Sequence, residues 1–123
     1  MAGKPLEGLR VLIVEDEAMI AMLIEDLLGE LGASPVKIAS SIEEASESIS
    51  SLVFDTAILD VNLRGKVTFP LADMLLERQL PFAFATGYGA ATLPEKYRAV
   101  PVLQKPFQQE QLERALVAAR SAG

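Results

Sequence analysis

The chain has 123 residues, of which 50% are apolar and 23% are charged, a composition typical of one compact globular domain. It contains no cysteine and no histidine, which excludes disulfides, zinc sites built on those ligands, and Ser-His-Asp triads. The net charge of −6 opposes direct binding to nucleic acid or to an anionic membrane, and no apolar run approaches the roughly 20 residues needed to cross a bilayer. We therefore expect a single cytoplasmic domain over residues 1–123, with its core at about 9–120 and no signal peptide.

Five short apolar segments alternate with helical patterns, which is typical of a parallel sheet covered by helices on both faces. Lys37 in the second segment and Pro101 in the fifth indicate that these two strands lie at the edges of the sheet. The predicted strands are Leu9–Val14, Val36–Ala39, Phe54–Leu59, Phe82–Ala85 and Val100–Gln104.

Helical spacing of apolar residues predicts the connecting helices. The buried face of the first helix is predicted to carry Ile20, Leu23, Ile24, Leu27, Leu28 and Leu31, and that of the second to carry Ile42, Ala45, Ile49 and Leu52, with its serines facing water. Ser40 or Ser41 forms a capping box with Glu43 or Glu44. A loop is predicted over Val61–Thr68, a third helix over Pro70–Gln79 and a short helix near Glu95–Arg98. The last helix buries Leu112, Ala115, Leu116 and Ala119.

Polar side chains follow four of the predicted strands, at the end where an open parallel sheet binds its ligands. They are Glu15, Asp16 and Glu17 after the first strand, Asp60 after the third, Thr86 after the fourth and Lys105 after the fifth. Taken singly, each is typical of a solvated turn, a cap or a surface charge. Their common position at the same end of successive strands favours one site.

Carboxylates that lie this close together repel each other unless a cation lies between them, and oxygen ligands of this kind suit Mg²⁺. A carboxylate beside Mg²⁺ can act as a nucleophile toward phosphorus. Lys105 and the Thr86 hydroxyl would then neutralise and orient the phosphoryl oxygens. The residues therefore predict phosphoryl transfer to a carboxylate.

The pattern Glu15-Asp16, Asp60, Thr86 and Lys105-Pro106 resembles the receiver domain of bacterial two-component response regulators, over about Leu9 to Arg120. The resemblance implies a (βα)5 fold with the flavodoxin-like strand order 2-1-3-4-5 and, on this chain, no output domain.

The same resemblance implies the role of each site residue. Asp60 would be the phospho-acceptor, and Thr86 and Lys105 would hold the phosphoryl group. Mg²⁺ would be bound by Asp60, directly by Asp16, through water by Glu15, and by the backbone carbonyl of Asn62. The Lys105–Pro106 peptide would be cis.

The segment Phe82–Gly89 is similar to the alphaproteobacterial receiver subgroup named for its Phe-Ala-Thr-Gly-x-Tyr pattern (FATGUY), although here Tyr88 directly follows Gly87. Members of that subgroup are commonly partnered with HWE-type histidine kinases in general stress signalling. Most receivers carry an aromatic switch residue three positions before the lysine, where this chain has Val102. Gly87 and Tyr88 are the nearest candidates for a substitute, although Tyr88 could equally be a half-buried ring that packs the loop.

Two other chemistries fit the residues less well. A small aspartyl-phosphate phosphatase needs a second acid two positions after its nucleophile, and Asn62 cannot exchange a proton there. A flavin-binding module needs a phosphate loop after the first strand, where the acidic triplet would repel the phosphate. A third alternative is an unphosphorylated pseudo-receiver that only binds proteins, which a phosphorylation assay would distinguish.

The expected function is that of a stand-alone receiver phosphorylated by a histidine kinase or a histidine phosphotransfer protein. It would signal by binding a downstream regulatory protein and would catalyse only its own phosphorylation and dephosphorylation. The alternatives are a phosphoryl sink and a phosphorelay intermediate. A monomer or weak dimer is expected.

Overall fold

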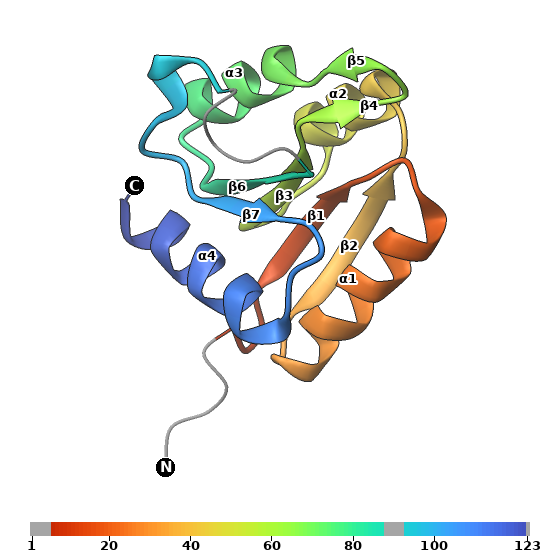
Figure 1. The fold of residues 1–123 in the computed structure, drawn as a ribbon, viewed down its shortest axis with the longest axis vertical. Coiled ribbons are helices and arrows are strands. Elements are labelled where there is room, and N and C mark those ends of the chain that lie inside the picture. Colours follow the sequence, from red (N-terminus) through yellow and green to blue (C-terminus); the bar gives the residue numbers. More distant parts are fainter. Residues whose placement is uncertain (1–5, 88–92, 123) are drawn as a thin grey trace.

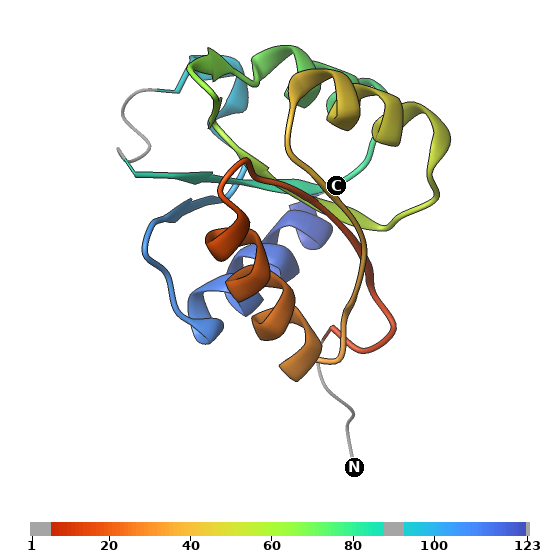
Figure 2. The same ribbon diagram turned by 90° about the vertical axis from the view of Figure 1, so that its right-hand side faces the viewer.

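The computed structural model describes residues 6–87 and 93–122, and these form a five-stranded parallel sheet between two pairs of helices (Figures 1 and 2). The strand order is β2-β1-β3-β6-β7, which is the predicted order with both expected edge strands at the edges. The sheet strands are β1 (Arg10–Val14), β2 (Ser34–Ala39), β3 (Thr56–Asp60), β6 (Phe82–Thr86) and β7 (Val102–Gln104).

Helices α1 (Ala18–Glu30) and α4 (Gln109–Ala122) cover one face of the sheet, and α2 (Ile42–Ser51) and α3 (Phe69–Glu77) cover the other (Figure 2). The described part of the β6–β7 connection contains the single-turn 3-10 helix η2 (Glu95–Tyr97), where a short helix was predicted near Glu95–Arg98. The helices lie in the crossover connections between strands. Parallel strands need such connections, because the chain must return to the same end of the sheet before each new strand.

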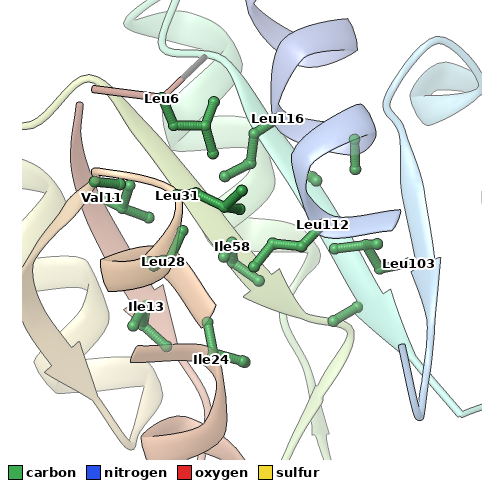
Figure 3. Packing of buried hydrophobic residues seen from close by; sticks show 14 of the residues in the cluster. Leu6, Val11, Ile13, Ile24, Leu28, Leu31, Ile58, Leu103, Leu112 and Leu116 are labelled. Carbon is green, nitrogen blue, oxygen red and sulfur yellow. The ribbon is translucent and has the colours of Figure 1, made fainter. Parts of the chain in front are cut away.

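Two apolar layers hold the helices to the sheet. On the α1–α4 face, the labelled leucines and isoleucines of Figure 3 interlock between the two helices and strands β1, β3 and β7. On the α2–α3 face, Leu12, Val14 and Leu59 of the sheet pack against helical residues such as Ile49 and Leu75. The central strand β3 is buried along its whole length, as expected for a sheet covered on both faces.

The predicted burial was wrong at three positions in or next to the first two helices. Leu23 of α1 is 48% exposed, and Leu52 lies just past the end of α2 and is 39% exposed. Ser48 is buried although the serines of α2 were expected to face water, because its hydroxyl donates back to the carbonyl of Glu44 at 2.8 Å. That local bond removes the cost of burying the hydroxyl group.

The capping box was predicted correctly, and the structure selects its members. Ser41 accepts the backbone N–H of Glu44 at 3.1 Å, while the Glu44 carboxylate accepts the backbone N–H of Ser40 at 2.8 Å. The pairing fixes the start of α2 immediately after β2.

The segment predicted as a loop over Val61–Thr68 contains a β-hairpin. Strands β4 (Asn62–Leu63) and β5 (Lys66–Val67) pair antiparallel around a two-residue turn. Both turn residues have positive φ, 51° at Arg64 and 82° at Gly65, which is the backbone required by the tight turns that match the twist of a hairpin. The prediction missed the hairpin because each strand has only two residues, too few to show an alternating pattern.

Candidate phosphoryl-acceptor site

The predicted site residues meet at the carboxyl end of the sheet. Glu15 follows β1, Asp60 ends β3, Thr86 ends β6 and Lys105 follows β7, so four strands bring together residues that are up to 90 positions apart. Glu15, Asp60 and Thr86 are all buried. The strand-end rule therefore placed these side chains in one site.

Lys105 is the cation that joins two of the acids. Its Nζ donates to Glu15 Oε1 at 2.8 Å and to Asp60 Oδ2 at 2.9 Å, and its side chain is only 17% exposed. Burial alone would lower the pKa of Lys105, but the hydrogen bonds to Glu15 and Asp60 outweigh burial and raise the pKa above its ordinary value. The ammonium is therefore held in its charged form between the two carboxylates.

Glu15 is the most strongly perturbed acid in the site. Burial raises its pKa to about 7, against the hydrogen bonds from Lys105 and from the backbone N–H of Glu17, which lower it; the nearby charge of Asp60 raises it further. One lysine does not compensate for the burial of Glu15 beside a second carboxylate. The pocket therefore favours an additional positive charge.

A cation could supply that charge, with Glu15, Asp16 and Asp60 as its ligands. One carboxylate oxygen from each lies within 4.8 Å of the others. A hard cation such as Mg²⁺ takes oxygen ligands from one or two carboxylates and keeps several waters, so this donor set fits it, and it provides no soft ligand for zinc or copper. Asn62, whose backbone carbonyl was the predicted further ligand, lines the same cavity.

The backbone around Asp60 is held in place by the hairpin that follows it. The Thr68 hydroxyl, which is fully buried, donates to the carbonyl of Asp60 and, at 3.1 Å, to the carbonyl of Val61. The Asp60 Oδ1 atom accepts the backbone N–H of Asn62 at 3.4 Å. Asp60 Oδ2 accepts from Lys105 Nζ, so the Asp60 carboxylate has a fixed orientation.

An open cavity of about 720 Å³ gives access to this carboxylate. Asp16, Asp60, Thr86 and Lys105 all line it, together with Arg64 and Gly65 of the hairpin turn. The Thr86 carbonyl accepts the backbone N–H of Lys105 at 2.8 Å, which ties the ends of β6 and β7 together. Asp60, Thr86 and Lys105 are therefore all accessible from one cavity.

The peptide between Lys105 and Pro106 is cis. Val102, at the position where receivers usually carry an aromatic residue, pairs in register with Phe84 and packs against the cluster that contains Phe84 and Tyr97. Gly87 is exposed and lines the cavity, whereas Tyr88 lies outside the described residues. The roles suggested for Gly87 and Tyr88 stay predictions.

Two polar contacts next to the site were missed by sequence reasoning. The backbone N–H of Arg64 donates to Asp16 Oδ2 at 2.9 Å. The hydroxyl of the fully buried Tyr97 donates to Asp73 Oδ1 at 2.6 Å. A Gly at position 65 between apolar Leu63 and Val67 was a signal for the hairpin, whereas nothing local to Tyr97 indicated its partner on α3.

Comparison with known proteins agrees with this geometry. The family model of the response regulator receiver domain matches residues 11–117 of this chain. SdrG from Sphingomonas melonis Fr1 is 41% identical and has a TM-score of 0.83, over 92% of this chain and 97% of that one. The receiver domain of the PhyR response regulator from Erythrobacter litoralis is 25% identical with a TM-score of 0.76, over 94% of this chain and 92% of that one.

Among curated proteins, the sensory transduction protein LytR of Staphylococcus haemolyticus is 30% identical over 112 residues, which is 88% of this chain and 44% of that protein. The transcriptional regulatory protein PdtaR of Mycobacterium tuberculosis is 32% identical over 102 residues, 80% of this chain and 50% of that protein. The chain thus spans half or less of the length of these relatives. In the described residues, no helix is both long and apolar enough to cross a membrane. With the family model matched over most of its length and the strand order and strand-end residues in place, the chain belongs to the response regulator receiver domain family of two-component signalling.

Proposed function

We propose that this receiver accepts a phosphoryl group on Asp60 and signals through phosphorylation-dependent binding to a regulatory protein. The observation that carries the proposal is the placement of the Asp60 carboxylate. It ends the central strand in an open cavity, 2.9 Å from the Lys105 ammonium and within 4.8 Å of two further acids. A strand-end acid that served only as a cap or a turn residue would need neither the lysine nor the acidic neighbours.

In the proposed reaction, an Asp60 Oδ atom attacks the phosphorus of a phosphorylated imidazole. The new O–P bond forms as the P–N bond breaks, and the imidazole nitrogen keeps that electron pair and takes a proton from solvent. Lys105 moves from pairing with the carboxylate to pairing with a phosphoryl oxygen, and the Thr86 hydroxyl donates to another. Both interactions stabilise negative charge on the group being transferred, which is the main requirement of phosphoryl transfer.

The residues that would hold Mg²⁺ are Glu15, Asp16, Asp60 and the backbone carbonyl of Asn62. When bound, Mg²⁺ supplies the positive charge that offsets the carboxylates and the incoming phosphoryl oxygens. Glu15 and Asp16 directly follow β1, and Asp16 lines the same cavity as Asp60. Their role is to keep that charge beside Asp60.

The proposed phosphoryl donor is a histidine kinase, of the HWE type, or a histidine phosphotransfer protein. The FATGUY-like segment Phe82–Gly89 supports this choice, as does the similarity to a PhyR described as a stress response regulator, which is 31% identical over 94% of this chain. We place the protein in stress signalling on that basis. A phosphoryl sink and a phosphorelay intermediate use the same site and differ only in whether a downstream protein binds the phosphorylated form.

The test is phosphorylation by acetyl phosphate in the presence and absence of Mg²⁺, read by intact mass. Wild type should gain one phosphoryl group only with Mg²⁺, and Asp60→Asn should gain none. Asp26→Asn, which changes an exposed acid of α1, is the matched control and should behave as wild type. Labelling of Asp60→Asn, or no labelling of wild type by either acetyl phosphate or a panel of kinases, would refute the proposal.

A further inference from the structure

The β4–β5 hairpin touches both functional strand ends of the site. At its base, the buried Thr68 hydroxyl holds the carbonyl of Asp60, the proposed acceptor. At its tip, the backbone N–H of Arg64 donates to Asp16 Oδ2 at 2.9 Å, although these residues are 48 positions apart. Between them Leu63 is fully buried in the α2–α3 layer and anchors the hairpin to the core.

The turn geometry is what directs the Arg64 N–H toward Asp16. Arg64 and Gly65 have φ values of 51° and 82°, the paired left-handed backbone of a tight hairpin turn. A Cβ built on Gly65 would meet no atom within 4 Å, so the residue at this position is restricted by backbone conformation alone and not by space.

From these contacts we infer that the Arg64–Gly65 turn is a positioning element for the metal site: the Arg64 peptide N–H orients the Asp16 carboxylate for cation binding beside Asp60. This inference rests on the proposed function, since it concerns the same Mg²⁺ site. A carboxylate that already has one oxygen hydrogen-bonded loses less conformational freedom when it binds a cation. Partners of this kind, which contact the ligand and not the metal, typically change metal affinity by about 10-fold or more when removed.

The inference concerns the peptide group and not the guanidinium. Arg64 is exposed and lines the cavity, and the positive charge of its side chain would repel a cation. Removing the side chain while keeping the N–H should therefore leave Mg²⁺ affinity equal or higher, whereas removing the N–H should lower it. The two effects have opposite signs, so a pair of variants separates them.

The decisive pair is Arg64→Pro, which lacks the N–H and cannot adopt the φ of 51°, and Arg64→Gly, which keeps the N–H and favours the same backbone conformation. Mg²⁺ is titrated into each unphosphorylated protein and followed by amide chemical shifts. The rate of phosphorylation by acetyl phosphate is then measured against Mg²⁺ concentration. We expect Arg64→Pro to need about 10-fold more Mg²⁺ for half-saturation by both measurements, with a rate near that of wild type once Mg²⁺ is saturating.

A second pair of variants changes the backbone preference of the turn while leaving the Arg64 N–H in place. Gly65→Val disfavours positive φ and should weaken Mg²⁺ binding in the same direction, while Gly65→Asn tolerates it and should remain close to wild type. Equal half-saturation in wild type, Arg64→Pro and Gly65→Val would overturn the inference, as would an equal loss in Arg64→Pro and Arg64→Gly. If wild type itself binds no Mg²⁺, the proposed function fails first, and that result is recognised without any variant.

Discussion

Lys105 is the residue on which the resting site depends most directly, because it is the ammonium that bridges Glu15 and Asp60. Replacing it with alanine leaves two buried carboxylates without their shared cation but removes no part of the apolar core. We expect Lys105→Ala to fold and to bind beryllium fluoride, a phosphoryl mimic, with a much smaller set of amide shift changes than wild type. Lys37→Ala, which removes a surface pair with Glu44, is the control. Matching shift changes in Lys105→Ala and wild type would show that Lys105 takes no part in the response to the phosphoryl mimic.

Glu15 gives a pH-dependent prediction for the metal-free protein. Its pKa rises from 4.5 to about 7 on folding, chiefly because of burial, so the folded state binds the proton more tightly than the unfolded chain does. This group therefore favours folding below pH 4.5, and that contribution is lost as the pH rises to about 7. In EDTA at pH 8, Glu15→Gln should melt several degrees above wild type, since its amide keeps an oxygen for Lys105 and removes the buried charge.

The same comparison at pH 4.5 supplies the control for Glu15→Gln. There the wild-type carboxyl is largely protonated in the folded protein, so the two melting temperatures should converge. A difference that stays the same at both pH values would show that the substitution acts through packing and not through the charge of Glu15.

At the scale of the elements, Tyr97 connects η2 to α3 by ring packing and hydrogen bonds. Its ring packs against Phe69 and Phe84, with ring centroids 5.2 Å and 5.5 Å away, and its hydroxyl donates to Asp73 Oδ1 at 2.6 Å and to the Phe69 carbonyl at 3.2 Å. Tyr97→Phe keeps the ring and removes both hydrogen bonds. We expect it to lower the free energy of unfolding by about 1 to 2 kcal/mol and to speed amide exchange in residues 95–98.

Lys96→Ala is the comparison that separates the contribution of the Tyr97 hydroxyl from that of the neighbouring Lys96–Asp73 ion pair. Lys96 also pairs with Asp73, at 3.2 Å, but both side chains are largely exposed, so its removal should change stability little. If Tyr97→Phe is no less stable than Lys96→Ala in urea unfolding, the hydroxyl contributes nothing beyond the surface pair.

The elements also show what the sequence could and could not predict. All five sheet strands followed from apolar segments, because a buried parallel strand needs an unbroken apolar run. Lys37 and Pro101 indicated the two edge strands, and the full strand order was what the receiver resemblance implied. Glu15, Asp60, Thr86 and Lys105 were placed together by the strand-end rule, which depends only on topology. The Arg64 and Tyr97 contacts were missed because they join residues 48 and 24 positions apart through loop conformations that no local pattern encodes.

At the scale of the whole molecule, a chain of contacts links Asp60, the proposed acceptor, to the α3–η2 surface. Asp60 lies in register with Ala85 of β6, and Thr86 is the next residue of that strand. Phe84, one position before Ala85, packs edge-on against Tyr97, which is hydrogen-bonded to α3. Val102 leaves the usual aromatic position on β7 without a ring, whereas Phe69, whose ring contacts both Phe84 and Tyr97, lines the site cavity.

A displacement of Thr86 toward a phosphoryl oxygen should therefore be felt at η2. We expect beryllium fluoride with Mg²⁺ to slow amide exchange chiefly in residues 87–98, of which 88–92 lie outside the described residues, and to do so less at residues 93–98 in Tyr97→Phe. Hydrogen exchange measured by mass spectrometry resolves these peptides. The reference is residues 42–51 of α2, on the same face of the sheet but outside this chain of contacts, where exchange should be unchanged. Equal exchange of residues 93–98 with and without beryllium fluoride would exclude η2 from the response. An equal slowing in wild type and Tyr97→Phe would show that the response bypasses the Tyr97–Asp73 hydrogen bond.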